Sequence, residues 1–220
     1  DSNSRLQPWQ GCALPLSYAR VRSGQIARPH GFGKKRRRAQ DLHGRAARVS
    51  LPAMPHANEG DLFARMQHLG IENTTHRHPP VFTVEESRLV HGQMPGGHCK
   101  SLFLKDKKDQ LWLLVVLEDR RVDLKVLPKN IGSARLSFGN PDLLVEVLGV
   151  VPGSVTPFAL INDTTQRVRV VLDKEMLEHD LLNYHPLTNA ATTAIAAADL
   201  VRFIRSCGHD PLILDFADLI

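Results

Sequence analysis

The chain has 220 residues, of which 42% are hydrophobic and 5% aromatic, and its formal net charge is +5. This length suits one folded domain with an extension, and no apolar run is long enough to cross a membrane. The three cysteines, Cys12, Cys99 and Cys207, are scattered and form no CxxC pair, which excludes a disulfide framework and favours a reducing, cytoplasmic setting.

The positive charge is concentrated near the N-terminus. Residues 1–53 contain 11 lysines and arginines against 2 acidic residues, whereas residues 54–220 contain 17 against 21. One interpretation of the N-terminal segment, with its basic run at 34–38, is an arm that neutralises RNA phosphates. The other is a disordered or non-native extension, which we favour because regular patterning starts only after Met54. We therefore expect one folded domain over residues 54–220.

The first predicted elements are two helices. Apolar residues recur at helical spacing over residues 61–69, and Gly70 follows as a typical helix end. Further on, Thr83 and Glu86 form a capping box, in which each side chain satisfies a free backbone N–H of the first turn. This pattern predicts a short second helix that ends near Val90.

Two strands and a helix follow. Residues 99–105 and 111–117 have the composition of strands and are separated by a polar turn, so they predict a β-hairpin. The second strand is apolar on both faces, which indicates a central place in the sheet. Asn140 followed by Pro141 is typical of a helix start, because the missing N–H of proline is harmless there. This helix is predicted to end at Gly149.

The C-terminal third continues the mixed pattern. Residues 168–172, 192–195 and 212–216 predict strands, and residues 199–207 predict a helix that ends before Gly208. Strands and helices are interspersed without the regular alternation of a doubly wound fold. The predicted class is therefore α/β, with a single mixed, partly antiparallel sheet flanked by helices and a basic, irregular N-terminal extension.

Common catalytic and cofactor motifs are missing. His76 and His78 would share a face on a strand, yet no HExxH motif or zinc-type spacing occurs, so we predict no metal. His98 and Cys99 would point to opposite faces of a strand, which argues against a Cys-His dyad. Cys207 is expected at a helix end, where the dipole raises a thiol pKa. Neither a serine-nucleophile elbow nor a nucleotide-binding glycine loop is present, and we predict no cofactor.

Three local features remain as candidates for function. Lys100 is a lone cation in an apolar strand, either an edge residue with its head in water or a buried charge that awaits an anionic partner. Residues 149–157 contain two glycines, two prolines and two hydroxyls. This composition is typical of a stiff loop that presents backbone N–H groups to a ligand, or of a plain connection. Residues 185–189, with Thr192 beyond them, form a polar group between apolar segments.

In this order and spacing, segments 78–83 (HPPVFT), 100–104 (KSLFL), 149–158 and 185–192 resemble the YbaK/ProX family of aminoacyl-tRNA editing proteins. The resemblance extends from about Gly60 to the C-terminus and leaves the basic segment without a counterpart. Within the family, the chain is most similar to the free-standing alanyl-tRNA(Pro) deacylases. The resemblance implies a trans-editing enzyme that hydrolyses the ester of mischarged Ala-tRNA(Pro) without a cofactor.

The resemblance also implies roles for individual residues. Lys100 would anchor a phosphate of the terminal adenosine or the amino-acid end of the substrate. The loop that begins at Gly149 would supply N–H groups near the developing oxyanion, and His185 would orient the ribose or the water. The implied catalytic residues are thus Lys100, His185 and Gly149. Where the family usually has asparagine after the lysine, this chain has Ser101, which leaves the substrate contact at that position open.

Selection of a small amino acid is implied as well. Missing methylenes cost a synthetase only about 1–3 kcal/mol of discrimination, so a second pocket must admit alanine and exclude proline. Apolar residues near Val81, Phe82 and Phe158 are expected to form its walls. The implied substrate-binding positions are His78, Phe82, Ser101, Gly153, Ser154, Thr156, Phe158, Asn189 and Thr192.

The expected partner is the acceptor end of tRNA(Pro) carrying a small amino acid. Prolyl-tRNA synthetase or an elongation factor is a further expected partner, and no membrane is expected. Two alternatives stay open. A cysteinyl-tRNA(Pro) deacylase of the same family would differ in pocket chemistry more than in fold. A non-catalytic, basic RNA-binding module would bind through the N-terminal charge and cleave nothing.

Overall fold

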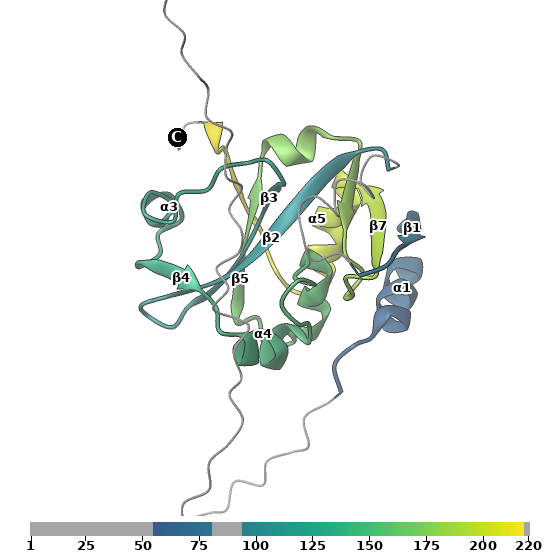
Figure 1. Cartoon of the computed structure of the whole chain (residues 1–220), viewed down its shortest axis with the longest axis horizontal. Coiled ribbons are helices and arrows are strands. Elements are labelled where there is room, and N and C mark those ends of the chain that lie inside the picture. Colours follow the sequence, from purple (N-terminus) through teal and green to yellow (C-terminus); the bar gives the residue numbers. More distant parts are fainter. Residues whose placement is uncertain (1–54, 81–93, 218–220) are drawn as a thin grey trace, which may run out of the picture. The chain divides into compact units, whose positions relative to one another are not determined.

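The computed structural model describes residues 55–80 and 94–217. Over these residues, helices and one eight-stranded sheet form an α/β arrangement (Figure 1). The predicted fold class, a mixed and partly antiparallel sheet flanked by helices, is confirmed. The N-terminal extension and the helix predicted to begin at Thr83 lie outside the described residues.

The sheet runs in the order β1-β7-β6-β2-β3-β5-β8, and β4 adds to β2. The pairs β1–β7, β7–β6, β2–β3 and β2–β4 are antiparallel, whereas β6–β2, β3–β5 and β5–β8 are parallel. The strands are β1 (Asn73–Arg77), β2 (Gly97–Asp106), β3 (Leu111–Leu117), β4 (Leu136–Phe138), β5 (Val168–Asp173), β6 (Leu181–Tyr184), β7 (Ala191–Ala196) and β8 (Leu212–Leu214). Strand β2 is therefore central: β6 pairs with its start, β3 with most of its length and β4 with its end.

Helix α4 (Pro141–Leu148) begins and ends where local sequence signals place it. In α4, the Asn140 side chain accepts a hydrogen bond from the N–H of Asp142 at 2.7 Å, and Pro141 occupies the first turn. Gly149 ends this helix with a φ of 66°, as the sequence predicts. The helices are α1 (Glu59–His68), α3 (Leu127–Ile131), α4 (Pro141–Leu148), α5 (Ala197–Ser206) and the 3-10 helices η2 (Pro157–Asn162) and η3 (Glu175–Glu178).

The interior is divided by the sheet, because successive side chains of a strand point to opposite faces. The odd-numbered residues of β3 pack with α1, α4, α5, η2 and η3 in the larger core. The even-numbered residues of β3 pack in a smaller core with residues of α3. We call these two sides of the sheet the α5 face and the α3 face.

The predicted hairpin of β2 and β3 is confirmed, with a register that runs from Cys99 opposite Leu117 to Lys105 opposite Leu111. The buried carboxylate of Asp106 organises its turn by accepting backbone N–H groups, including that of Lys108 at 2.8 Å. Burial alone would raise the pKa of Asp106, but these hydrogen bonds lower it. The turn is thus stabilised from within.

Three strands escaped prediction, one of them β4, which has only three residues. β1 is polar throughout (NTTHR) and mostly exposed at the sheet edge, so it lacks the alternation that identifies a half-buried strand. β6 has only four residues. No helix of the described segments is long and apolar enough to cross a membrane.

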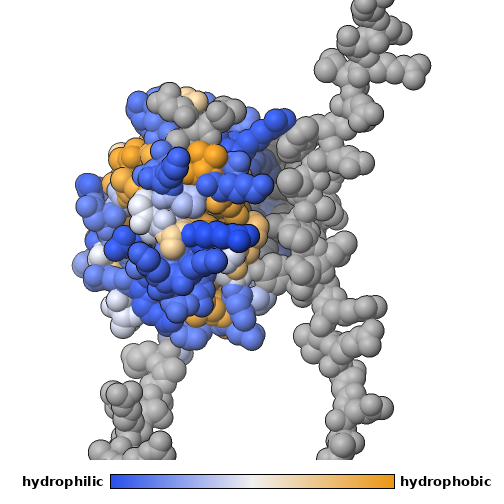
Figure 2. Space-filling model, turned by 90° about the vertical axis from the view of Figure 1, so that its left-hand side faces the viewer, coloured by the Kyte–Doolittle hydropathy of each residue, from blue (hydrophilic) through white to orange (hydrophobic). Residues whose placement is uncertain are grey.

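The side of the molecule that carries α3 and β4 has a mainly hydrophilic surface (Figure 2). Some hydrophobic side chains interrupt it. The exposed large hydrophobic residues of this part of the chain include Val126, 39% exposed, and Phe138 in β4, 42% exposed. Single exposed apolar side chains of this kind are ordinary and do not define a binding site.

Candidate active site

Strands β2, β6 and β7 carry polar residues on the α3 face. Lys100 shares its side of β2 with Leu102 and Leu104, both of which pack with the smaller core. The parallel pairing of His98 with Asn183 extends this face to β6, and the pairing of Asn183 with Ala194 extends it to β7. His98 of β2 is paired with Asn183 of β6. Two residues further along the chain from this pair lie Lys100, in β2, and His185, just after β6.

His78, Thr192 and His185 form a cluster at the end of this face. The His78 Nε2 atom lies 2.9 Å from the Thr192 hydroxyl, and its Nδ1 lies 2.8 Å from the carbonyl oxygen of Pro79. In a neutral ring, Nδ1 must donate to the carbonyl and Nε2 accepts from the hydroxyl. The rings of His78 and His185 are 6.4 Å apart between centroids. Two segments more than a hundred residues apart thus meet here.

The imidazole of His185 is oriented by a backbone group. Its Nδ1 lies 3.0 Å from the carbonyl oxygen of Ala191, the first residue of β7. Because a carbonyl only accepts, the ring carries its proton on Nδ1, and Nε2 of the neutral ring is an acceptor. An acceptor nitrogen suits a hydroxyl group or a water molecule as partner.

Lys100 is held by backbone carbonyl groups. Its Nζ donates to the carbonyl oxygens of Glu118 at 2.8 Å and Arg120 at 2.6 Å, just beyond the end of β3. The side chain is half-buried. Of the two interpretations left open by the sequence, an edge residue with its head in water does not describe this lysine. Two backbone carbonyl oxygens thus help to fix the position of its ammonium group.

Gly149 lies in a different environment. Its N–H donates to the carbonyl oxygen of Val145 at the end of α4, so this donor is already in use. A Cβ atom at Gly149 would come within 2.7 Å of the His56 ring and 2.8 Å of the Asn162 side chain. Close packing together with a positive φ requires glycine at this position. Its neighbours are His56 and Asn162.

The rest of the predicted loop divides into a buried and an exposed part. Ser154, Thr156 and Phe158 are buried, and the Thr156 hydroxyl accepts a hydrogen bond from the N–H of Phe158. Phe158 is 0% exposed and packs edge-on against Tyr184 in the larger core. Gly153, by contrast, is exposed, and a Cβ there would lie 3.9 Å from the Asn189 side chain. The loop tip therefore lies next to the segment that precedes β7.

Ser101 follows Lys100 in β2 and so points to the opposite face of the sheet. It pairs with Val115, which belongs to the larger core. The structure thus brings His78, His185 and Thr192 together, with Lys100 on the same face and Gly153 beside Asn189. It does not bring Ser101, Gly149 or Phe158 to them. Phe82 lies outside the described residues.

Cys99 and Cys207, the two cysteines within the described residues, carry no reactive thiolate. Cys99 packs against the larger core, where burial raises the pKa of its thiol to about 12. Burial also raises the pKa of Cys207. Both thiols are therefore protonated near neutral pH and poor nucleophiles. This agrees with the sequence-based arguments against a nucleophilic role for either residue.

Asn183 is a polar residue of this face that the sequence analysis missed. Its side-chain amide donates to the carbonyl oxygen of Pro95 at 2.9 Å and so holds the chain that enters β2. Its Oδ1 is buried and has no hydrogen-bond partner among the described residues. The available signal was a lone amide inside an apolar strand, LLNY.

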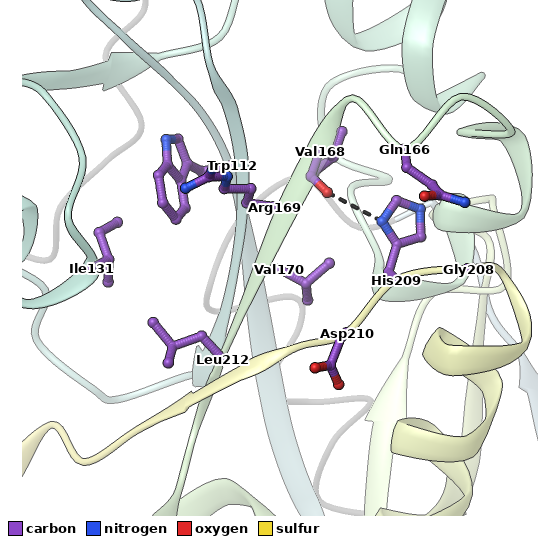
Figure 3. A pocket seen from close by; sticks show the side chains of 10 residues that line it. All are labelled: Trp112, Ile131, Gln166, Val168, Arg169, Val170, Gly208, His209, Asp210 and Leu212. Carbon is purple, nitrogen blue, oxygen red and sulfur yellow. Dashed lines mark hydrogen bonds between the residues drawn. The ribbon is translucent and has the colours of Figure 1, made fainter.

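A cavity of about 340 Å³ lies elsewhere, between β5, β8 and α3 (Figure 3). Arg169 lies over the Trp112 ring in it, with 5.4 Å between the guanidinium carbon and the ring centroid. The His209 Nδ1 lies 3.1 Å from the carbonyl oxygen of Val168. Neither Lys100 nor the histidine cluster lines this cavity. Within residues 55–80 and 94–217, no group of three metal-binding side chains gathers.

Comparison with known proteins identifies the family. The aminoacyl-tRNA editing domain matches residues 78–203. The prolyl-tRNA synthetase associated domain-containing protein 1 of Bos taurus is 42% identical over 157 residues, which cover 69% of this chain and 91% of the relative. The prolyl-tRNA editing protein ProX of Acetoanaerobium sticklandii is 36% identical over 149 residues, covering 67% and 91%. The chain therefore belongs to the aminoacyl-tRNA editing domain family, and the predicted resemblance is confirmed.

The fold agrees with this assignment. A solved structure described as a candidate trans-editing enzyme for prolyl-tRNA synthetase superposes with a TM-score of 0.56 at 21% identity. The match covers 71% of this chain and 92% of that one. At this identity the likeness concerns the fold alone.

Proposed function

We propose that this protein is an editing deacylase that hydrolyses the ester between alanine and tRNA(Pro). Membership of the editing family supports the reaction class, and the names of its relatives point to proline-specific tRNA. The observation that carries the proposal is the arrangement on the α3 face. There Lys100 shares a side of the sheet with His78, His185 and Thr192, residues from four separate segments.

Hydrolysis of this ester requires the protein mainly to position the substrate and the attacking water. An aminoacyl ester is already activated, so water can add to its carbonyl carbon without a covalent enzyme intermediate. The bond from that carbon to the ribose oxygen then breaks, and the ribose oxygen leaves with a proton. Lys100 anchors the substrate by its charge, and His185 offers its Nε2 acceptor to the ribose hydroxyl or the attacking water. The high pKa of Cys99 is in keeping with a mechanism that uses no thiolate.

Small side chains support the choice of alanine. Thr192 and Ala194 are two residues apart on β7, so both face the same side of the sheet as Lys100. Gly153, at the tip of the loop next to Asn189, has no side chain. We propose that the amino acid of the substrate is bound near these positions, where proline is rejected by its size. Steric exclusion is the stronger filter because a larger side chain must displace packed atoms.

We also propose the setting of the reaction. The substrate is the acceptor end of tRNA(Pro), with prolyl-tRNA synthetase or an elongation factor as a further partner, and the cytoplasm as the compartment. Exposed basic residues near the hairpin, such as Lys107 and Lys108, suit contacts with phosphate groups.

A deacylation assay tests the proposal. Purified protein is mixed with alanyl-, cysteinyl- or prolyl-tRNA(Pro), and release of the amino acid is followed. We expect release of alanine while prolyl-tRNA(Pro) stays intact. In Lys100→Ala, kcat/KM should fall by roughly ten- to a hundredfold, because a hydrogen bond to a charged group is worth about 1.5–3 kcal/mol.

Arg167→Ala provides the matched control. This residue forms an exposed ion pair with Glu146 at 2.6 Å, on another part of the surface, and its loss should leave kcat/KM unchanged. Normal deacylation by Lys100→Ala would refute the site. Faster release of cysteine than alanine would change the substrate, and RNA binding without any cleavage would favour a binding module.

A further inference from the structure

The carbonyl groups that hold Lys100 belong to a tight turn. The N–H of Arg120 donates to the carbonyl oxygen of Leu117 at 3.1 Å, and the N–H of Glu118 donates to that of His98 at 2.8 Å. These hydrogen bonds tie the turn both to itself and to β2. Through this turn, the carbonyl oxygens of Glu118 and Arg120 reach the Lys100 ammonium group.

The side chain of Arg120 extends from the same turn to β5 and η3. Its Nε donates to Asp173 Oδ2 at 3.1 Å, and another guanidinium nitrogen donates to Glu175 Oε2. The Asp173 side chain is 0% exposed and that of Arg120 is 14% exposed. Asp173 in turn accepts the backbone N–H of Glu175 at 3.2 Å. The arginine is thus clamped at the edge of the core between two carboxylates.

Burial makes this clamp hard to open. A buried carboxylate without its cationic partner carries a large desolvation penalty, so Asp173 strongly favours any arrangement that keeps Arg120 in place. Burial alone would lower the pKa of Arg120, but the hydrogen bonds that it donates to Glu175 and Asp173 raise it. The guanidinium therefore stays charged and bound over the whole working pH range.

Lys100 needs such support. A lysine ammonium group on a four-carbon stem rotates freely unless acceptors fix it. We propose that Arg120 is a positioning residue for Lys100: its side chain, bound to Asp173 and Glu175, fixes the turn whose backbone carbonyl oxygens orient the Lys100 ammonium group. Its importance for deacylation rests on the function proposed above. Its importance for the geometry of Lys100 does not.

A double-mutant cycle tests the catalytic consequence. We expect Arg120→Ala to lower kcat/KM for alanyl-tRNA(Pro) by about tenfold, within the range of coupling between residues in contact. In a Lys100→Ala background, the same change should cause no further loss, because no ammonium group remains to be oriented. Additive losses would overturn the proposal, since a purely structural arginine lowers activity whether or not Lys100 is present.

Two further variants separate positioning from folding. Glu175→Gln removes one charge from the partly exposed end of the clamp and keeps its shape, and it should lower kcat/KM less than Arg120→Ala does. Arg120→Lys keeps the charge and should restore part of the activity that alanine loses. If Arg120→Ala does not fold, the same cycle is carried out with Glu175→Gln, and additivity there would equally overturn the proposal.

A measurement without substrate separates this inference from the proposed function. The Lys100 side chain is followed by NMR through its 13Cε and 15Nζ resonances. We expect Arg120→Ala to move these resonances toward those of exposed lysines such as Lys107, whereas Arg167→Ala leaves them unchanged. Unchanged Lys100 resonances in Arg120→Ala would overturn the inference even if alanine is released. A clear change in a protein that cleaves no ester would uphold the inference and refute the proposed function.

Discussion

The α5 face and the α3 face of the sheet differ in chemistry although the same strands build both. On the α5 face, five helical elements cover a core in which even a thiol, that of Cys99, is kept protonated. On the α3 face, the next residue of β2 is the charged Lys100, held by backbone carbonyls. Cys99 and Lys100 are neighbours in β2, yet the first places its thiol against the larger core and the second places its ammonium group on the opposite face. Strand alternation thus separates the stabilising side of this domain from the side that we propose to bind substrate.

The largest expected effect concerns stability on the α5 face. Phe158→Ala removes a fully buried ring that packs against Tyr184 and Phe203, and it should lower the free energy of unfolding by about 3–5 kcal/mol. Chemical denaturation measures the loss. Phe138→Ala, at an exposed position of β4, is the control and should cost less than about 1 kcal/mol. Equal losses would contradict the assignment of Phe158 to the core.

Two neighbouring threonines on β7, one on each face of the sheet, test whether the two faces differ in function. Thr192→Val removes the hydroxyl that donates to His78, and Thr193→Val removes one that bonds Thr75 at 2.8 Å on the other face. Each change should destabilise the protein by about 1 kcal/mol, the usual net value of a hydrogen bond. Only Thr192→Val should also lower kcat/KM for alanyl-tRNA(Pro). Equal activity of the two variants would show that the face does not matter for function.

The titration of Cys99 should appear as a pH dependence of stability. Its pKa is raised from 9.0 to about 12 in the folded protein, so folding favours the protonated thiol. The resulting stabilisation is complete below pH 9 and is lost as the pH rises toward 12. Wild type and Cys99→Ala are compared by denaturation between pH 7 and pH 11, the wild type losing more stability as the pH rises. Parallel curves would mean that the thiol is not buried in this way.

The smallest effect is expected for the N-terminal segment. A chain that begins at Met54 should deacylate alanyl-tRNA(Pro) as fast as the full chain, if residues 1–53 are dispensable. The assay is repeated at increasing salt concentration. A truncation that loses tRNA affinity together with the salt dependence of binding would instead identify the basic segment as an RNA-binding arm.

Local signals in the sequence predicted much of the fold. The hairpin of β2 and β3 and the start of α4 at Asn140 depend on residues close together in the chain, so pattern and capping were enough. Strand β1 was missed because an exposed edge strand needs no apolar alternation. The parallel pairing of β6 with β2 joins segments more than eighty residues apart, and no local pattern encodes such a register.

For the candidate site, too, local patterns identified residues but not the long-range pairing that brings them together. His78, Lys100, His185 and Thr192 were named from the sequence, but their common face became visible only through the pairing of β2, β6 and β7. The helix end predicted at Gly149 already implied that its N–H bonds a carbonyl oxygen of α4 and is not available to a substrate. The part played by Arg120 depends on its ion pair with Asp173, fifty-three residues away in the chain, which composition cannot reveal.

The self-contained turn after β2 has a practical consequence. Lys107 lies seven residues beyond Lys100, on the order of 20 Å along an extended strand, and Asp106 stabilises the turn without help from the histidine cluster. A fluorophore attached at Lys108, an exposed position of this turn, would sit far from the reacting ester. Because Lys107 and Lys108 are also the residues that we propose to contact phosphate groups, a reporter at this hairpin tip would respond to tRNA arrival and release while lying far from the hydrolysed bond.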